Sequence, residues 1–323
     1  MKSILALMEV DLKLVLKNIF FWVLVGMLIA IILVVNFLLP ERIGTSSPEI
    51  VTYGIEMDGY KQADSIDELK KMVEQYDNTV GVALDKGNYT VIANNFSDKQ
   101  AAAVILPFLE GTDKKTEVSI SQIGNSITPP PFNKRCLPVF ICFEAIVQGF
   151  LLAGVLMLNE KSGKIVRALQ ASPIHALQYW TAKVLLFSAI GGLYALLMAV
   201  FTVGLKFPVI PFILLSMIAS AIFTMIGLIT ATFFRSLNNW FMLTALILGV
   251  NMLTMFAYVF PSLSLPFMKL IPSYPFIFLY EQILFGGLRW TTDMVSIIVW
   301  FSVLCAASLV CIKNKFLRPQ KGV

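Results

Sequence analysis

The chain has 323 residues, of which 57% are hydrophobic and 14% charged, and its formal net charge is +5. A soluble globular domain carries about 25% charged residues, so the composition excludes an ordinary soluble protein and indicates a polytopic membrane protein. The basic residues flank apolar runs and form no patch. This distribution predicts a role in membrane orientation and no nucleic-acid partner.

Residues 1–18 are predicted to form an amphipathic helix. Apolar and charged residues fall on separate faces, a pattern typical of a helix lying in the membrane interface. The alternative is a cytosolic helix that packs on the protein. The apolar face holds Ile4, Leu5, Met8, Leu12, Val15 and Leu16, and the charged face holds Lys2, Glu9, Lys13 and Lys17.

Six segments are long enough to cross a bilayer core, which needs about 20 apolar residues. We therefore predict an α-helical polytopic fold with six transmembrane helices, one at 19–39 and five within 137–313, followed by a cytoplasmic tail at 314–323. The individual predicted spans are 19–39, 137–158, 184–206, 209–233, 240–260 and 293–313.

The short loops predict the orientation of these spans, because cytoplasmic loops carry an excess of lysine and arginine. With the N-terminus inside, twelve such residues lie on the inner side and three on the outer side. We therefore expect a plasma-membrane protein with both termini in the cytoplasm. The inner set is Lys2, Lys13, Lys17, Lys161, Lys164, Arg167, Lys183, Arg235, Lys313, Lys315, Arg318 and Lys321, and the outer set is Lys206, Lys269 and Arg289.

Residues 40–136 are predicted to form a small extracytoplasmic α/β domain between the first two spans. Ser65 followed by two acidic residues is a helix start signal. Alternating apolar residues on either side of a turn at 85–88 predict a pair of strands. The predicted strands are 50–56, 79–84 and 89–93, and the predicted helices are 65–75 and 97–109.

The apolar segment 261–290 is interrupted by four prolines, so it does not form a continuous span. Broken helices at membrane depth occur where protein or a water-filled cavity shelters the backbone. We predict two re-entrant half-helices entering from the outer face. An apolar loop on the membrane surface is the alternative.

No residue pattern indicates catalysis or a resident cofactor. The only histidine is His175, the four cysteines lack CxxC spacing, and Gly163-Lys164 is followed by Ile165 instead of serine or threonine. Histidine triads, zinc sites and a nucleotide-binding P-loop all need residues that are missing. We expect no enzyme activity, metal or cofactor on this chain, and any nucleotide-driven work needs a separate ATPase.

Polar residues inside the spans are candidates for a substrate path, because ionisable groups are expensive in a membrane. The candidates are Glu144, Gln148, Asn251 and Glu281. Glu144 and Gln148 lie one helical turn apart on the same face. The alternatives are a Glu144 side chain that reaches headgroup water, an Asn251 hydrogen bond between helices, and a Glu281 that caps a half-helix.

Two segments, one basic and lying between the second and third spans, the other proline-rich and lying before the last span, each carry a group of residues typical of one family. Glu160-Lys161-x-Gly163 is followed by Leu169 and Ser172-Pro173-Ile174, and Pro272-x-Tyr274 precedes Gly286. These residues, together with the order of the predicted parts, resemble the membrane subunit (permease) of type-2 ABC transporters, mostly exporters. The resemblance covers nearly the whole chain.

The resemblance implies that two permease chains pair, as a homodimer or heterodimer, above two cytoplasmic ABC ATPase chains that bind ATP and Mg²⁺. Residues 160–174 would be the coupling helix that sits in a groove of the ATPase. The implied coupling residues are Glu160, Lys161, Gly163, Lys164, Arg167, Leu169, Ser172 and Pro173. The expected function is export of a small molecule, peptide or lipid. The alternative is a membrane sensor or scaffold whose extracytoplasmic domain binds a ligand.

Overall fold

The computed structural model describes residues 2–40, 49–55, 60–75, 79–85, 88–93, 118–122, 132–163, 165–172, 174–259, 265–286 and 292–316. Contacts divide the chain into two compact units. One unit combines residues 1–41 with 132–323, and the other is 42–131.

Within the described residues, the first unit contains six helices that are long and apolar enough to cross a membrane, so the chain is a helical multi-pass membrane protein. They agree with the six predicted spans. The second and third are longer than predicted, because charged residues assigned to a connecting loop lie within the helices. The six are Ile19–Leu38, Phe132–Ser162, Ala176–Val203, Val209–Phe233, Leu237–Val259 and Asp293–Asn314.

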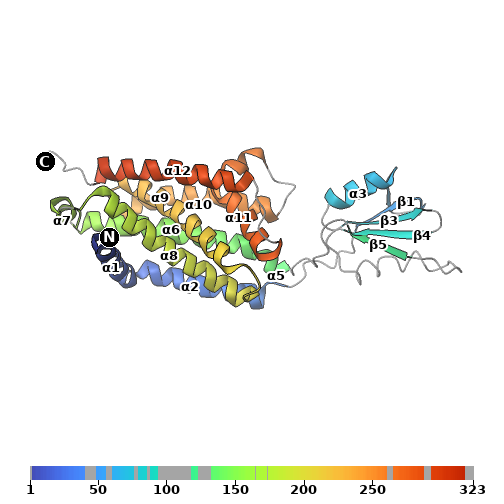
Figure 1. Cartoon of the computed structure of the whole chain (residues 1–323), viewed down its shortest axis with the longest axis horizontal. Helices are drawn as coiled ribbons and strands as arrows, with labels where there is room; N and C mark the ends of the chain where they lie inside the picture. Colours follow the sequence, from blue (N-terminus) through green and yellow to red (C-terminus); the bar gives the residue numbers. More distant parts are fainter. Residues whose placement is uncertain are drawn as a thin grey trace. The chain divides into compact units, whose positions relative to one another are not determined.

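Several of these spans combine α-helix with a shorter turn at one end, and further short helices lie between them. Figure 1 shows the long helices running side by side. The elements are α1 Lys2–Lys17, α2 Ile19–Leu33, η1 Val34–Leu38, α5 Phe132–Arg135, α6 Leu137–Ser162, α7 Ile165–Ala171, α8 Ala176–Val203, α9 Val209–Phe233, α10 Leu237–Val259, η3 Pro266–Leu270, α11 Ser273–Glu281, η4 Gln282–Gly286, α12 Thr292–Cys311 and η5 Ile312–Phe316.

Helices α6, α8 and α9 form the interior of this unit. The most apolar stretch of the α6 span is 78% buried, against 28% or less for the spans of α2, α10 and α12. The turn between α8 and α9 is tight, because Gly204 adopts a positive φ of 78° after α8 and Pro208 precedes α9. Glycine is favoured at such a φ because it has no side chain to clash.

Helix α1 packs against α8 with a face that includes an acidic residue. Asp11 and Val15 are buried, whereas Leu5, Leu12 and Leu16 are exposed. The predicted apolar face is therefore divided into two parts. One part covers α8, and the other is uncovered and suits the membrane interface.

The predicted coupling segment 160–174 is not one helix. Its first three residues are the last turn of α6, and the chain then turns at Gly163. A separate helix α7 follows at Ile165–Ala171. Helix α8 begins after His175, whose backbone N–H donates to Oε1 of Gln178 at 3.1 Å. Glycine in place of a helix former at 163 explains the break.

The described part of the proline-rich segment contains the 3-10 turn η3, the short helix α11 and the π-helical turn η4, which continues α11. Two half-helices are predicted there. Helix α11 buries Pro275, Phe276 and Tyr280 within the bundle. The Ser273 and Thr254 hydroxyls join α11 to α10 at 2.8 Å. Helix α11 is therefore part of the bundle, whereas Leu265, just before η3, and Phe267 and Leu270 of η3 are exposed. Residues 261–264 and 287–290 lie outside the described part.

The described part of the second unit is a five-stranded sheet with the order β2-β1-β3-β4-β5. Strands β3 and β4 pair antiparallel and the other neighbours are parallel. Helix α3, Ile66–Gln75, covers the sheet with Leu69 and Val73. The Ser65 hydroxyl accepts from the Glu68 N–H at 3.1 Å, which is the helix cap that the sequence predicts.

The predicted strands at 50–56, 79–84 and 89–93 correspond to β1, Glu49–Tyr53, β3, Thr79–Asp85, and β4, Asn88–Ala93. The structure adds two strands that the sequence did not predict, β2, Lys61–Gln62, and β5, Val118–Gln122. The helix predicted at 97–109 lies outside the described residues.

Candidate functional site

Four polar side chains meet inside the bundle where α6 ends and α8 begins. The Lys183 Nζ lies 2.7 Å from Oε1 of Glu160 and 3.1 Å from Oδ1 of Asp11. Tyr179, one helical turn before Lys183, donates its hydroxyl to Oε2 of Glu160 at 2.5 Å. These four residues, referred to below as the charge cluster, join α1, α6 and α8.

The charge cluster is closed to solvent. Lys183 is 0% exposed and Glu160 is 3% exposed. Buried charges are tolerated where they are paired and hydrogen-bonded, as they are here. The Lys183 Nζ also lies 4.7 Å from the centre of the Tyr179 ring, which is a cation–π contact.

The cluster holds two carboxyl groups and one ammonium group. Burial raises the pKa of Asp11 above its usual value, while Lys183 and its positive charge act in the opposite direction. Because Lys183 is the only cation in the cluster, removing it would leave two acidic groups in an apolar interior. The three helices are therefore held together by a contact that is costly to open.

Lys161, the residue after Glu160, joins the same end of α6 to a fourth helix. Its Nζ donates to the backbone oxygens of Ala231 at 2.6 Å, Thr232 at 3.0 Å and Phe234 at 2.9 Å. These carbonyls lie at the end of α9, where the last four carbonyls of a helix lack partners within the helix. A cation at this position also suits the helix dipole.

Replacing Lys161 with methionine is expected to destabilise the chain by about 1–2 kcal/mol, because the carbonyls would lose a charged donor. Thermal unfolding of the purified chain measures this loss. The matched control is Lys13→Met, since the Lys13–Glu9 pair is exposed on both sides and such pairs contribute little. Equal midpoints for the two variants would contradict a capping role for Lys161.

Glu160 and Lys161 therefore point in different directions from consecutive positions. Glu160 reaches α1 and α8 through Lys183, and Lys161 reaches the end of α9. The last turn of α6 is thereby fixed to three neighbouring helices.

The predicted coupling residues divide into two groups. Glu160 and Lys161 point into the protein, whereas Gly163 is exposed and Leu169 and Ser172 are half-buried. Ser172 donates its hydroxyl to the Leu169 carbonyl at 2.7 Å, at the end of α7. Lys164, Pro173 and the side chain of Arg167 lie outside the described residues.

The predicted substrate-path residues lie on three helices, α6, α10 and α11, and their role stays a prediction. Glu144 is 1% exposed and Gln148 is 0% exposed on α6. The Gln148 amide donates to the Phe187 carbonyl at 3.4 Å, and its Oε1 accepts from Ser220 at 3.2 Å. Burial of Glu144 contradicts the alternative in which it reaches headgroup water.

The other two candidates lie on different helices. Asn251 of α10 is 4% exposed, and its Nδ2 donates to the Ile247 carbonyl of its own helix at 2.8 Å. No hydrogen bond from Asn251 to another helix is seen within the described part of the chain. Glu281 ends α11 and interacts with Tyr258 of α10.

Asp11, Tyr179 and Lys183 were not predicted as site residues. The available signal was Asp11, an acidic residue between the apolar positions Met8 and Val15 of the amphipathic helix. An acid on a face that packs against protein requires a buried cation, and Lys183 is the only charged residue of α8.

No protein-family model, curated protein or solved structure matches the chain. Within the described ranges no group of three or more histidine, cysteine, aspartate or glutamate residues could hold a metal ion. The polar atoms of the charge cluster bond to one another and connect α1, α6 and α8.

Proposed function

We propose that the chain is the membrane-spanning permease subunit of an ABC exporter and works with a separate cytoplasmic ATPase that carries ATP and Mg²⁺. The observation that supports this most is that the last turn of α6 is bonded to three neighbouring helices. Helix α7 follows a turn that is fixed to α1, α8 and α9, so a partner that binds α7 moves several spans together.

The exposed surface of α7 is a suitable contact for such a partner. Ile165 is 39% exposed, and Ala168 and Ala171 are also exposed. Residues three positions apart lie on the same side of a helix. The sequence also places Lys164 and Arg167 in this segment, and their positive charge suits an acidic groove on the ATPase. In this proposal α7 and both termini are cytoplasmic, in the plasma membrane, and two permease chains pair.

Affinity capture of the tagged chain in mild detergent tests the proposal. We expect a stoichiometric ATPase to bind the wild-type chain, and the double variant Ala168→Glu/Ala171→Glu to lose at least about tenfold in affinity through charge repulsion. These side chains are exposed, so the fold is not expected to change. Replacing Glu160 is a poorer test, because it also breaks the charge cluster.

Two outcomes would contradict the proposal. One is a folded wild-type chain that captures no ATPase. The other is equal capture by the wild-type chain and the double variant. Ligand binding by the unit 42–131 without an ATPase partner would favour the second candidate function, a membrane sensor or scaffold.

A further inference from the structure

Glu144 is an isolated acidic residue in the interior of the bundle. The chain contains no other charged residue between Arg135 and Glu160. Glu144 is 1% exposed, and neither of its carboxyl oxygens has a hydrogen-bond partner within the described residues. A bare carboxylate in an apolar interior is so unfavourable that the group takes a proton or pairs with a cation.

Helices α8 and α9, which cover this part of α6, provide no cation for Glu144 among their described residues. Helix α9 has no charged residue, and Lys183 of α8 is held in the charge cluster. The Tyr194 hydroxyl of α8 lies within electrostatic range of Glu144, and it too lacks a partner in the described part of the chain. A proton therefore neutralises Glu144 while α6, α8 and α9 are packed against one another.

Glycine contacts place Glu144 at the junction of the three interior helices. A Cβ on Gly191 would lie 2.4 Å from the Ser220 Oγ and 2.7 Å from the Gln148 Oε1, so α6, α8 and α9 approach closely there. The next turn, toward the start of α6, contributes Glu144 from α6 and Tyr194 from α8. Separation of these helices would uncover the carboxyl group between them.

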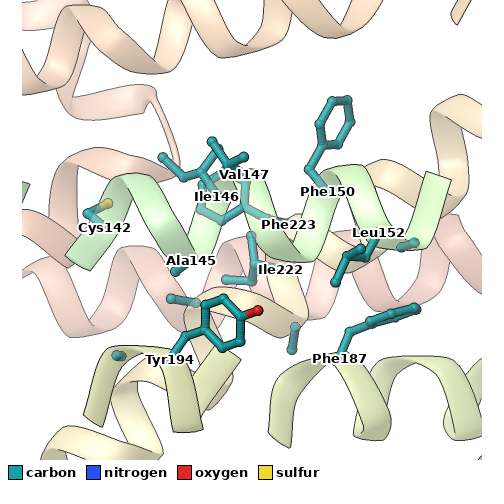
Figure 2. Close-up of a cluster of buried hydrophobic side chains, with 14 of the residues drawn as sticks. Cys142, Ala145, Ile146, Val147, Phe150, Leu152, Phe187, Tyr194, Ile222 and Phe223 are labelled. Atoms are coloured by element: carbon teal, nitrogen blue, oxygen red, sulfur yellow. The ribbon is translucent and has the colours of Figure 1, made fainter. Parts of the chain in front are cut away.

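The surroundings of this turn are apolar and aromatic. Figure 2 shows the Tyr194 ring between α8 and α6, among apolar side chains from three helices. Ala145, Ile222 and Phe223 are all buried there. A single carboxylate in such surroundings complements a positive charge carried on a large apolar body, because aromatic faces also attract cations.

We propose that Glu144 recognises a hydrophobic organic cation, an ammonium or phosphonium compound with an apolar body, when α6, α8 and α9 separate. This proposal rests on the proposed function and names its substrate class. Metal ions are a poorer match, because hard metal ions require several oxygen ligands and Glu144 is the only carboxyl group of this turn.

The test uses the full chain in lipid nanodiscs without any ATPase, and tetraphenylphosphonium as the probe. Equilibrium dialysis should show saturable binding to the wild-type chain. Tetraphenylborate, which has the same shape and the opposite charge, should show none. Glu144→Gln should weaken the binding at least about tenfold, because a charged partner is lost. The control is Asp67→Asn, an exposed residue of the other unit.

A second measurement needs no variant. Dicyclohexylcarbodiimide reacts with protonated carboxyl groups that are buried in apolar surroundings, so we expect modification of Glu144 in the wild-type chain. Tetraphenylphosphonium should protect this residue and tetraphenylborate should not. Mass spectrometry of the digested chain locates and quantifies the modification. If Glu144→Gln fails to fold, this protection alone decides the result.

Absence of saturable cation binding to the wild-type chain would overturn the proposal, and so would unchanged binding by a folded Glu144→Gln chain. The assay is independent of the ATPase. Cation binding without ATPase capture would therefore refute the permease function and keep the site, whereas capture without cation binding would refute the site alone.

Discussion

Replacing Lys183 with methionine is expected to destabilise the chain by about 3–5 kcal/mol, the usual cost of leaving a buried charge without its partner. Methionine keeps most of the volume and removes the ammonium group. Glu160 and Asp11 would remain in the interior without a cation, and at least one would have to take a proton. The thermal unfolding midpoint of the purified chain measures this loss.

The matched control is the triple variant Asp11→Asn/Glu160→Gln/Lys183→Met. It removes all three charges together, and replacing a complete buried ion set by neutral residues is often close to neutral in stability. We therefore expect the triple variant to recover most of the stability lost by Lys183→Met. Two outcomes would contradict a role for the cluster in holding α1, α6 and α8 together. One is a Lys183→Met chain that unfolds at the wild-type midpoint. The other is a triple variant that is no more stable than Lys183→Met.

The membrane spans could be predicted because they depend on local composition. An apolar run of sufficient length forms a helix in a bilayer whatever its neighbours are. The Ser65 cap could be predicted for the same reason, since its partner Glu68 is three residues away. Local signals of this kind need no knowledge of the tertiary fold.

The charge cluster could not be predicted in this way, because its members are distant in sequence. Asp11 and Lys183 are separated by 172 positions, and no local pattern pairs them. Lys183 was assigned to a loop because it ends a charged segment, yet it lies within α8 and is completely buried. Pairing with two carboxyl groups overrides the usual exclusion of lysine from the interior.

The coupling segment shows the same limit. Its charged residues predict an exposed helix, and only α7, Ile165–Ala171, matches that description. Glu160 and Lys161 have partners in α1, α8 and α9 that become evident only when the helices are assembled. The predicted coupling role of these two residues stays a prediction. Their contacts in the structure are with α1, α8 and α9 of the same chain.

Helix α6 connects the two polar sites of the membrane unit. Glu144 and Glu160 are separated by sixteen positions on the same helix, which corresponds to about 24 Å at 1.5 Å per residue. The helix is continuous between them, so it moves as one body. At its α7 end this helix is bonded to α8 through Glu160 and to α9 through Lys161.

Replacing both Gly149 and Gly227 with alanine is expected to destabilise the chain by about 2–6 kcal/mol, the sum of two overpacking costs. A Cβ on Gly149 would lie 2.6 Å from the Ser220 carbonyl oxygen, and one on Gly227 would lie 2.5 Å from the Phe150 carbonyl oxygen. Both obstacles are backbone atoms, which cannot rotate away as a side chain can. Helices α6 and α9 would have to separate, and thermal unfolding of the purified chain measures the cost.

The control for this pair is Gly249→Ala in α10, where a Cβ would meet no atom within 4 Å. Alanine is the better helix former by up to about 1 kcal/mol, so this variant should be as stable as the wild-type chain or more stable. If the Gly149→Ala/Gly227→Ala variant unfolds at the wild-type midpoint, close backbone approach does not set the spacing of α6 and α9. If this variant is strongly destabilised, α6 and α9 form a fixed pair. The separation that exposes Glu144 would then occur between this pair and α8.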